Sequence, residues 1–215
     1  IKVTGYKLDT RIVERGHSRA IKFDVSISKN RNFSYNQILR LIKASGLSKN
    51  SKSLFYRIYR SLFESELKVH GHKHDDMKFH EVGDIDSIID IASVSICLDK
   101  LGISEILYSV IPLSFKIAPA TFELLAGKEV FFTGNLYENI TPTGAAVLDA
   151  LGSQVNRSGP VLRIGKTSYG AGTYDSPGVS NVLRASEILD QDFKADTVDK
   201  VEANIDDMNP QFFEY

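Results

Sequence analysis

The stretch DIDSIIDIASVSICLDKLG, residues 84–102, decides how this chain folds. Its apolar residues recur at spacings of three and four, which predicts an α-helix over residues 85–101, ended by Gly102. Residues 86, 90, 93 and 97 then share one stripe of that helix, which holds Asp86, Asp90, Ser93 and Cys97. A neighbouring face, with Ile85, Ile89, Ala92 and Ile96, is expected to pack inward. The helix therefore carries two carboxylates along the edge of a buried face.

The residues just before this helix are rich in histidine. Four of the five histidines are His70, His72, His74 and His80, and Glu81 follows at once. Imidazole with carboxylate suits a borderline divalent ion such as nickel, zinc or manganese, whereas paired carboxylates suit Mg²⁺ or Mn²⁺ with a nucleotide phosphate. Acid–base catalysis is the competing chemistry. Spacing alone does not decide between metal binding and acid–base catalysis. His72 and His74 could also lie in a solvated loop, and the helix dipole alone favours acidic residues in a first turn.

Outward from this helix, strands and helices are mixed without strict alternation. Strands are predicted at 6–13, 20–28, 105–114, 129–134 and 181–188, and helices at 35–45, 52–69, 118–127 and 142–151. Gly16 marks a hairpin turn, Ser34 caps the first helix and Gly46 closes it. Residues 169–178 are expected to form a glycine-rich loop. The predicted class is α+β, a mixed sheet with flanking helices.

Composition excludes several classes of function. The chain has 215 residues, a formal net charge of −1 and no basic stripe interleaved with aromatics, which excludes a broad nucleic-acid footprint. The single cysteine, Cys97, fits a reducing compartment. No apolar run approaches the roughly 18 residues of a membrane span. The chain begins with Ile1 and ends on an aromatic segment, so we expect both ends to be truncations of a longer protein.

Two further segments are candidates for ligand binding. TPTGAA (141–146) begins a helix whose free N–H groups suit a phosphate or carboxylate, and an ordinary Thr-Pro cap is the alternative. YGAGT (169–173) lets backbone approach a ligand closely. The candidate binding residues are Thr141, Thr143, Gly144, Gly170 and Gly172.

Eight collinear motifs resemble a known family. They are KVHG (68–71), FHEVG (79–83), DSIIDI (86–91), APATFELLAG (118–127), TPTGAA (141–146), YGAGT (169–173), NVLR (181–184) and NIDDMNP (204–210). This order resembles the nickel insertion proteins of nickel-pincer nucleotide cofactor synthesis, the LarC family. Departures are Lys78 where that family has a histidine, Asp84 where it commonly has alanine, and the lack of its Gly- and His-containing segment before APAT.

The resemblance implies a cytoplasmic enzyme, a nickel chelatase or cyclometallase of the lyase class. It would insert Ni²⁺ into a pyridinium-3,5-bisthiocarboxylic acid mononucleotide, using CTP with Mn²⁺ or Mg²⁺, to make the cofactor of lactate racemase. The implied catalytic residues are Glu81, Asp86 and Asp90, and the implied metal ligands are His70, His80 and Asp86. The division into ligand and base stays open.

The resemblance also implies two domains. Residues 1–196 would form a metal-handling domain, and residues 197–215 would begin a truncated nucleotide-binding domain. The 215-residue chain by itself would then be inactive. The alternative function is a nickel-binding and delivery module without chemistry of its own, using the histidines of 70–80. A third interpretation makes the acidic helix a homo-oligomer contact. No membrane or nucleic-acid partner is expected.

Overall fold

The computed structural model describes residues 3–28, 31–71, 83–134, 138–155, 162–175 and 180–189. The helices in this part are α1 (Tyr35–Lys43), α2 (Lys49–His70), α3 (Ile85–Leu101), α4 (Pro119–Leu124) and α5 (Pro142–Leu151). The strands are β1 (Tyr6–Arg15), β2 (Ser18–Ile27), β3 (Ile106–Tyr108), β4 (Ile111–Leu113), β5 (Val130–Phe132), β6 (Gly152–Gln154), β7 (Arg163–Ala171) and β8 (Val182–Leu189). The α+β class, with a mixed sheet and flanking helices, is confirmed.

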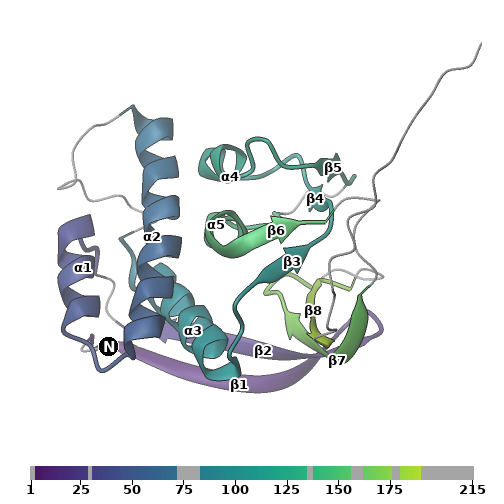
Figure 1. Cartoon of the computed structure of the whole chain (residues 1–215), viewed down its shortest axis with the longest axis horizontal. Helices are drawn as coiled ribbons and strands as arrows, with labels where there is room; N and C mark the ends of the chain where they lie inside the picture. Colours follow the sequence, from purple (N-terminus) through teal and green to yellow (C-terminus); the bar gives the residue numbers. More distant parts are fainter. Residues whose placement is uncertain are drawn as a thin grey trace, which may run out of the picture.

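The main sheet has the order β1-β2-β7-β8 and runs beneath the helices in Figure 1. Its first two strands form the predicted hairpin, with Ile12 opposite Ile21, and Gly16 at the turn has φ 55°. Strand β7 joins β2 in parallel where Gly170 lies opposite Ile21. Two small parallel pairs, β3 with β6 and β4 with β5, complete the strands that the structure describes.

Helix α2 is the centre of the core. Ser48 caps its first turn by accepting from the Ser51 N–H at 2.9 Å. The helix packs against α3, α4 and α5, and Figure 1 shows it standing between α1 and the α4–α5 pair. Its fully buried side chains each contribute roughly 1.5–3 kcal/mol to folding. They include Phe55, Ile58, Tyr59 and Leu62, as the helical spacing predicts.

Local contacts fix where α3 begins. Gly83 precedes its N-cap residue, Asp84, and accepts from the Phe33 N–H at 2.9 Å. Asp84 also forms a β-bridge with Asn32. At the other end Gly102 has φ 67°, the left-handed conformation that favours glycine. The predicted limits of this helix are therefore confirmed, and its acidic first turn is held against the segment before α1.

The structure corrects three local predictions. Residues 105–114 form two strands instead of one, since β3 pairs with β6 and β4 pairs with β5. Ala44, and not Gly46, is the C-cap of α1, because the Ala44 N–H already closes the last turn on Arg40 O and Ile42 O. The glycine-rich segment at 169–178 is a strand at its start, where β7 pairs with both β2 and β8.

Candidate functional site

A cavity of about 300 Å³ lies where the beginnings of α3 and α5 meet the C-terminal half of α2. It brings together two of the predicted groups, the carboxylates of α3 and the TPTGAA segment. The residues that line it are Leu62, Glu66, Asp86, Ser87, Asp90, Ala118, Glu138, Thr141, Pro142 and Thr143. Four of these residues are acidic, and the N-terminal ends of α3 and α5 both lie at the cavity.

The two α3 carboxylates differ in their surroundings. Asp86 is exposed, whereas Asp90, one turn later, is partly buried. Burial, and then the negative charge of Asp86, raises the pKa of Asp90 to about 6. The ammonium of Lys22 acts in the opposite direction. A carboxyl with a pKa near neutrality suits proton transfer, so Asp90 is the better placed of the two for general-base chemistry.

Lys22 reaches this helix from strand β2. Its side chain is 11% exposed, and its Nζ lies 3.2 Å from Asp24 Oδ1. Nζ also donates to the Phe23 carbonyl at 3.2 Å. The lysine is thus held in place by its own strand, on the face of the sheet that meets α3.

Glu66 is a site residue that the sequence interpretation missed. It lies in α2 and is 4% exposed, and its Oε2 lies 3.3 Å from His70 Nε2. This contact connects His70, one of the predicted metal ligands, to the cavity wall. Its sequence signal is the position of Glu66 four residues after Leu62, in line with a core residue of the same helix.

The opposite wall comes from the segment before α5. Thr141 caps this helix, and its Oγ1 accepts from the Gly144 N–H at 3.1 Å. Glu138 accepts from the Ala118 N–H at 3.4 Å, which ties the start of α4 to the same wall. The first turn of α5 brings Pro142 and Thr143 to the cavity, together with the positive end of a helix dipole. Pro142 has no N–H and the Gly144 N–H is bonded to Thr141, so Thr143 supplies the backbone donor of this turn.

Other predicted site residues do not meet at this cavity. Gly170 pairs with Leu183 and Ile21 in the main sheet, so its backbone serves strand pairing. A Cβ on Gly172 would lie 2.8 Å from Asn181 Oδ1, so close packing accounts for that glycine. Neither glycine is among the described residues that line the cavity. His72, His74, His80 and Glu81 lie outside the described residues, as do residues 197–215.

The described residues contain no ready-made metal site. Within those ranges, no group of three or more His, Cys, Asp or Glu side chains is placed to hold a metal ion. Cys97, on the same stripe as Asp90, is exposed. A metal at this cavity would therefore need donors beyond Asp86 and Asp90, from the substrate or from other parts of the protein.

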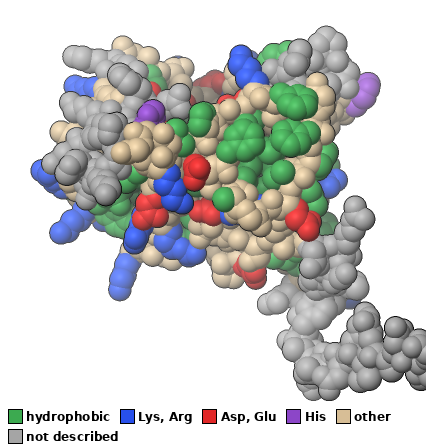
Figure 2. All heavy atoms as spheres, turned by 90° about the horizontal axis from the view of Figure 1, so that it is seen from above, with side chains coloured by type: hydrophobic (Ala, Val, Ile, Leu, Met, Phe, Trp, Pro, Cys, Tyr) green, Lys and Arg blue, Asp and Glu red, His purple; other side chains and the backbone are tan. Residues whose placement is uncertain are grey.

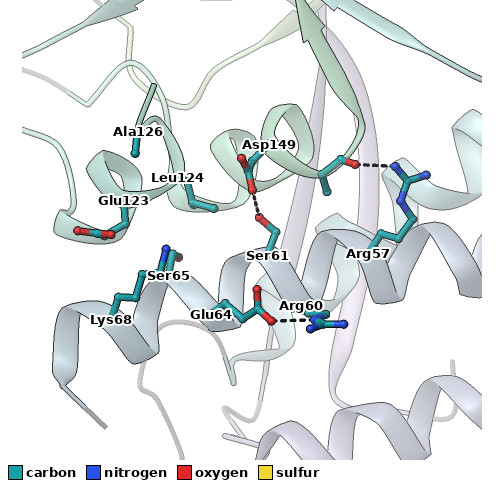
Figure 3. A pocket seen from close by; sticks show the side chains of 11 residues that line it. Arg57, Arg60, Ser61, Glu64, Ser65, Lys68, Glu123, Leu124, Ala126 and Asp149 are labelled. Atoms are coloured by element: carbon teal, nitrogen blue, oxygen red, sulfur yellow. Dashed lines mark hydrogen bonds and ion pairs between the residues drawn. The ribbon is translucent and has the colours of Figure 1, made fainter. Parts of the chain in front are cut away.

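A larger hollow of about 440 Å³ lies on another side of α2 (Figure 3). Its charged groups serve internal contacts. The Ser61 hydroxyl donates to Asp149 Oδ2 at 2.5 Å, and Arg57 donates to the Ala150 carbonyl at 2.7 Å. Arg60 pairs with Glu64 at 2.7 Å. The first two contacts hold α2 to α5, and the Arg60–Glu64 pair lies within α2, so the acidic cavity is the stronger candidate for the functional site.

An α+β protein whose cavity joins carboxylates to helix N-termini is of the kind that holds small charged ligands. A family model described as "Nickel insertion protein" matches residues 1–215, and the chain belongs to this family. The resemblance seen in the motifs is thereby confirmed. No helix in the described ranges combines the length and apolar character that a membrane crossing requires.

Curated relatives agree with this assignment. A "Putative nickel insertion protein" of Pelobacter propionicus is 38% identical over 98% of this chain and 56% of the relative. One of Citrifermentans bemidjiense is 37% identical over 98% of this chain and 58% of the relative. A Geobacillus kaustophilus protein, "Pyridinium-3,5-bisthiocarboxylic acid mononucleotide nickel insertion protein", is 36% identical over 86% of this chain and 50% of the relative. The chain thus spans little more than half the length of these relatives, and no solved structure matches it.

Proposed function

We propose that this chain takes part in inserting Ni²⁺ into pyridinium-3,5-bisthiocarboxylic acid mononucleotide, with Ni²⁺ as a substrate. The carrying observation is the meeting of Asp86 and Asp90 with the first turn of α5 in one cavity. Carboxylates bind cations and can accept a proton, and a helix N-terminus favours a phosphate. Family membership and the name of the Geobacillus relative support this substrate.

The chemistry requires a base. When a ring carbon becomes a ligand of nickel, its C–H bond breaks, the electron pair forms the carbon–nickel bond and the proton leaves. Asp90 is the proposed acceptor of that proton, because its raised pKa suits proton transfer near neutrality. Asp86, exposed at the cavity, is the proposed group that attracts Ni²⁺ as it enters. His80 and Glu81 remain proposed contributors from beyond the described residues.

The mononucleotide phosphate is proposed to lie at the start of α5. Thr141 and Thr143 of this turn line the cavity, and the Gly144 N–H orients the Thr141 side chain by donating to it. The ring would then reach toward Asp90. Gly170 and Gly172 are not part of this proposal, because pairing in the sheet and packing on Asn181 account for them.

The finer features follow the family resemblance. They are use of CTP with Mn²⁺ or Mg²⁺, a lyase-class cyclometallase reaction, supply of the lactate racemase cofactor and a cytoplasmic location. In this proposal residues 1–196 handle the metal, and residues 197–215 begin a nucleotide-binding domain. This chain by itself would then lack activity, and homo-oligomers are compatible with it.

A second candidate function is nickel delivery without chemistry. The observation that favours it is the contact between His70 Nε2 and Glu66 Oε2, which links this one histidine to the cavity wall. The acidic helix as a mere oligomer contact has less support, because Asp86 and Asp90 both line a cavity within the chain.

The test is nickel insertion by the longest natural form of the protein, with CTP, Mg²⁺, Ni²⁺ and the mononucleotide, followed by mass spectrometry of the nickel product. Asp86→Ala is expected to lower the rate about 10-fold or more, and Asp9→Ala, an exposed carboxylate of β1, serves as control. Delivery is favoured instead if His70→Ala abolishes stoichiometric Ni²⁺ binding in calorimetry while insertion at saturating Ni²⁺ is unchanged. Undiminished insertion by the Asp86 and Asp90 variants would contradict the site.

A further inference from the structure

Four phenylalanines are exposed in β5, in α4 and in the segment between β4 and α4. Figure 2 shows hydrophobic side chains gathered on the upper face of the molecule, the side on which Figure 1 draws α4 and β5. The exposed fractions are 72% for Phe115, 50% for Phe122, 52% for Phe131 and 55% for Phe132. Burying even one such ring stabilises a protein or a complex, so the neighbouring pair Phe115 and Phe132 indicates a binding surface.

Two of these rings form a stack. The ring centroids of Phe115 and Phe132 lie 5.4 Å apart, and the ring planes differ by 15°. Because each ring is more than half exposed, the pair presents aromatic surface to solvent while the two rings hold each other in place. A pre-ordered pair of this kind loses little side-chain entropy when a third planar ring is added.

The stack is connected to the acidic cavity through its backbone. Phe115 stands in the short segment between β4 and α4, and the far end of this segment, Ala118, lines the cavity. Asn139 holds the near end, because the Ser114 N–H donates to its side chain at 2.9 Å. Glu138, the neighbour of Asn139, holds the far end through the Ala118 N–H. The segment that carries Phe115 is thus fixed to the cavity wall at both ends.

We propose that Phe115 and Phe132 form a stacking platform at the edge of the acidic cavity, which receives the pyridinium ring of the mononucleotide before the ring reaches Asp90. This inference rests on the proposed function and adds the residues that recognise the ring. A pyridinium is planar, aromatic and cationic, and such a ring is attracted to the face of a phenylalanine. Lys116, exposed in the same segment, adds a positive charge for the anionic substituents of the ligand.

The chain offers a direct reporter, because it contains no tryptophan. Phe115→Trp introduces a single tryptophan in the platform, whose emission is excited separately from that of the nine tyrosines. Phe122→Trp introduces a comparison tryptophan on α4, where the parent residue is 50% exposed. The probes are nicotinamide mononucleotide, which carries a pyridinium ring and a phosphate, and ribose 5-phosphate, which lacks the ring. We expect saturable quenching by nicotinamide mononucleotide at position 115 and only linear, collisional quenching at position 122.

Calorimetry supplies the second measurement. Phe115→Leu is expected to weaken binding of nicotinamide mononucleotide about 3- to 10-fold and to leave ribose 5-phosphate binding unchanged. Equal, linear quenching at both tryptophans, no saturable binding to the unaltered chain, or unchanged affinity in Phe115→Leu would each overturn the platform. A shift of Phe115→Leu toward the monomer in sedimentation would overturn it too, in favour of a contact between copies of the chain.

Failure of the platform and failure of the proposed function are distinguishable in the nickel-insertion assay. If Asp90→Asn loses insertion while Phe115→Leu keeps the KM of the parent, the platform is overturned and the proposed function stands. A raised KM with little change in kcat for Phe115→Leu supports a ring-binding role. Circular dichroism of each variant checks the fold. Because Phe115 is exposed, we expect Phe115→Leu to leave the fold unchanged.

Discussion

Asp90 follows Asp86 by one turn of α3, and both carboxylates line the same cavity. The pair is unequal, since Asp86 is exposed and Asp90 is partly buried with a pKa raised to about 6. This inequality separates the roles that spacing left open. The exposed carboxylate attracts the incoming metal ion in our proposal, and the buried one accepts the proton.

The raised pKa of Asp90 predicts a pH-dependent stability. Its folded pKa, about 6, lies above its ordinary value of 3.8, so the ionised form costs free energy in the fold. The free energy of unfolding should therefore fall as the pH rises through this window, and Asp90→Asn should remove that fall. Allowing for solvent screening, we expect Asp90→Asn to stabilise the chain by about 1–2 kcal/mol at neutral pH.

Urea unfolding at about pH 4 and about pH 7.5 measures this effect. The gain from Asp90→Asn should be small at the lower pH, because the carboxyl is then protonated in the folded state and only partly ionised in the unfolded state. Asp9→Asn, on exposed β1, is the matched control and should change little at either pH. A destabilised Asp90→Asn at neutral pH would mean that the ionised carboxylate is held by favourable partners, contrary to the burial argument.

Gly83 sets the position of the acidic turn and gives a second prediction. A Cβ at this residue would collide with the Asn32 side chain and lie 2.5 Å from the Phe33 carbonyl oxygen. Gly83→Ala should therefore displace the start of α3 and destabilise the chain by about 1–3 kcal/mol. Gly46→Ala is the control, because nothing lies within 4 Å of a Cβ there. Equal unfolding midpoints for the two variants would show that the start of α3 adapts freely.

Acid stability tests the contact between α2 and the end of α3. Hydrogen bonds from Ser48, Ser51 and Asn50 lower the pKa of Asp99 to about 2. Because this pKa is depressed, the stabilisation should be present above 3.8 and be lost as the pH falls toward 2. Asp99→Asn should thus lower the unfolding midpoint at neutral pH, with the difference from the parent shrinking in acid. A difference that is constant with pH would exclude the charge as its cause.

The sequence predicted best where the signals are local. The helix at 85–101 has an apolar repeat and a terminal glycine, both readable without knowing the fold, and its limits are confirmed. The cap at Thr141 is equally local. That Asp90 and Thr141 line one cavity depends on how α3 and α5 pack around α2, which spacing along the chain does not encode.

Glu66 and Gly170 show why the sequence did not predict every site residue and strand. Glutamate is usually exposed on helices, and Glu66 is buried only because neighbouring elements pack on α2. Gly170 lies in a segment whose glycines favour a loop, yet pairing with β2 and β8 makes it part of a strand. In both cases long-range contacts outweighed the local preference.

The most direct test of the account is the rate of nickel insertion in Asp90→Asn, with Asp9→Asn as control, in the longest natural form of the protein at saturating Ni²⁺. Removing the proton acceptor should lower the rate about 100-fold or more without preventing mononucleotide binding. A rate within about twofold of the parent would contradict the assignment of Asp90 as the base, and with it the acidic cavity as the place of the reaction.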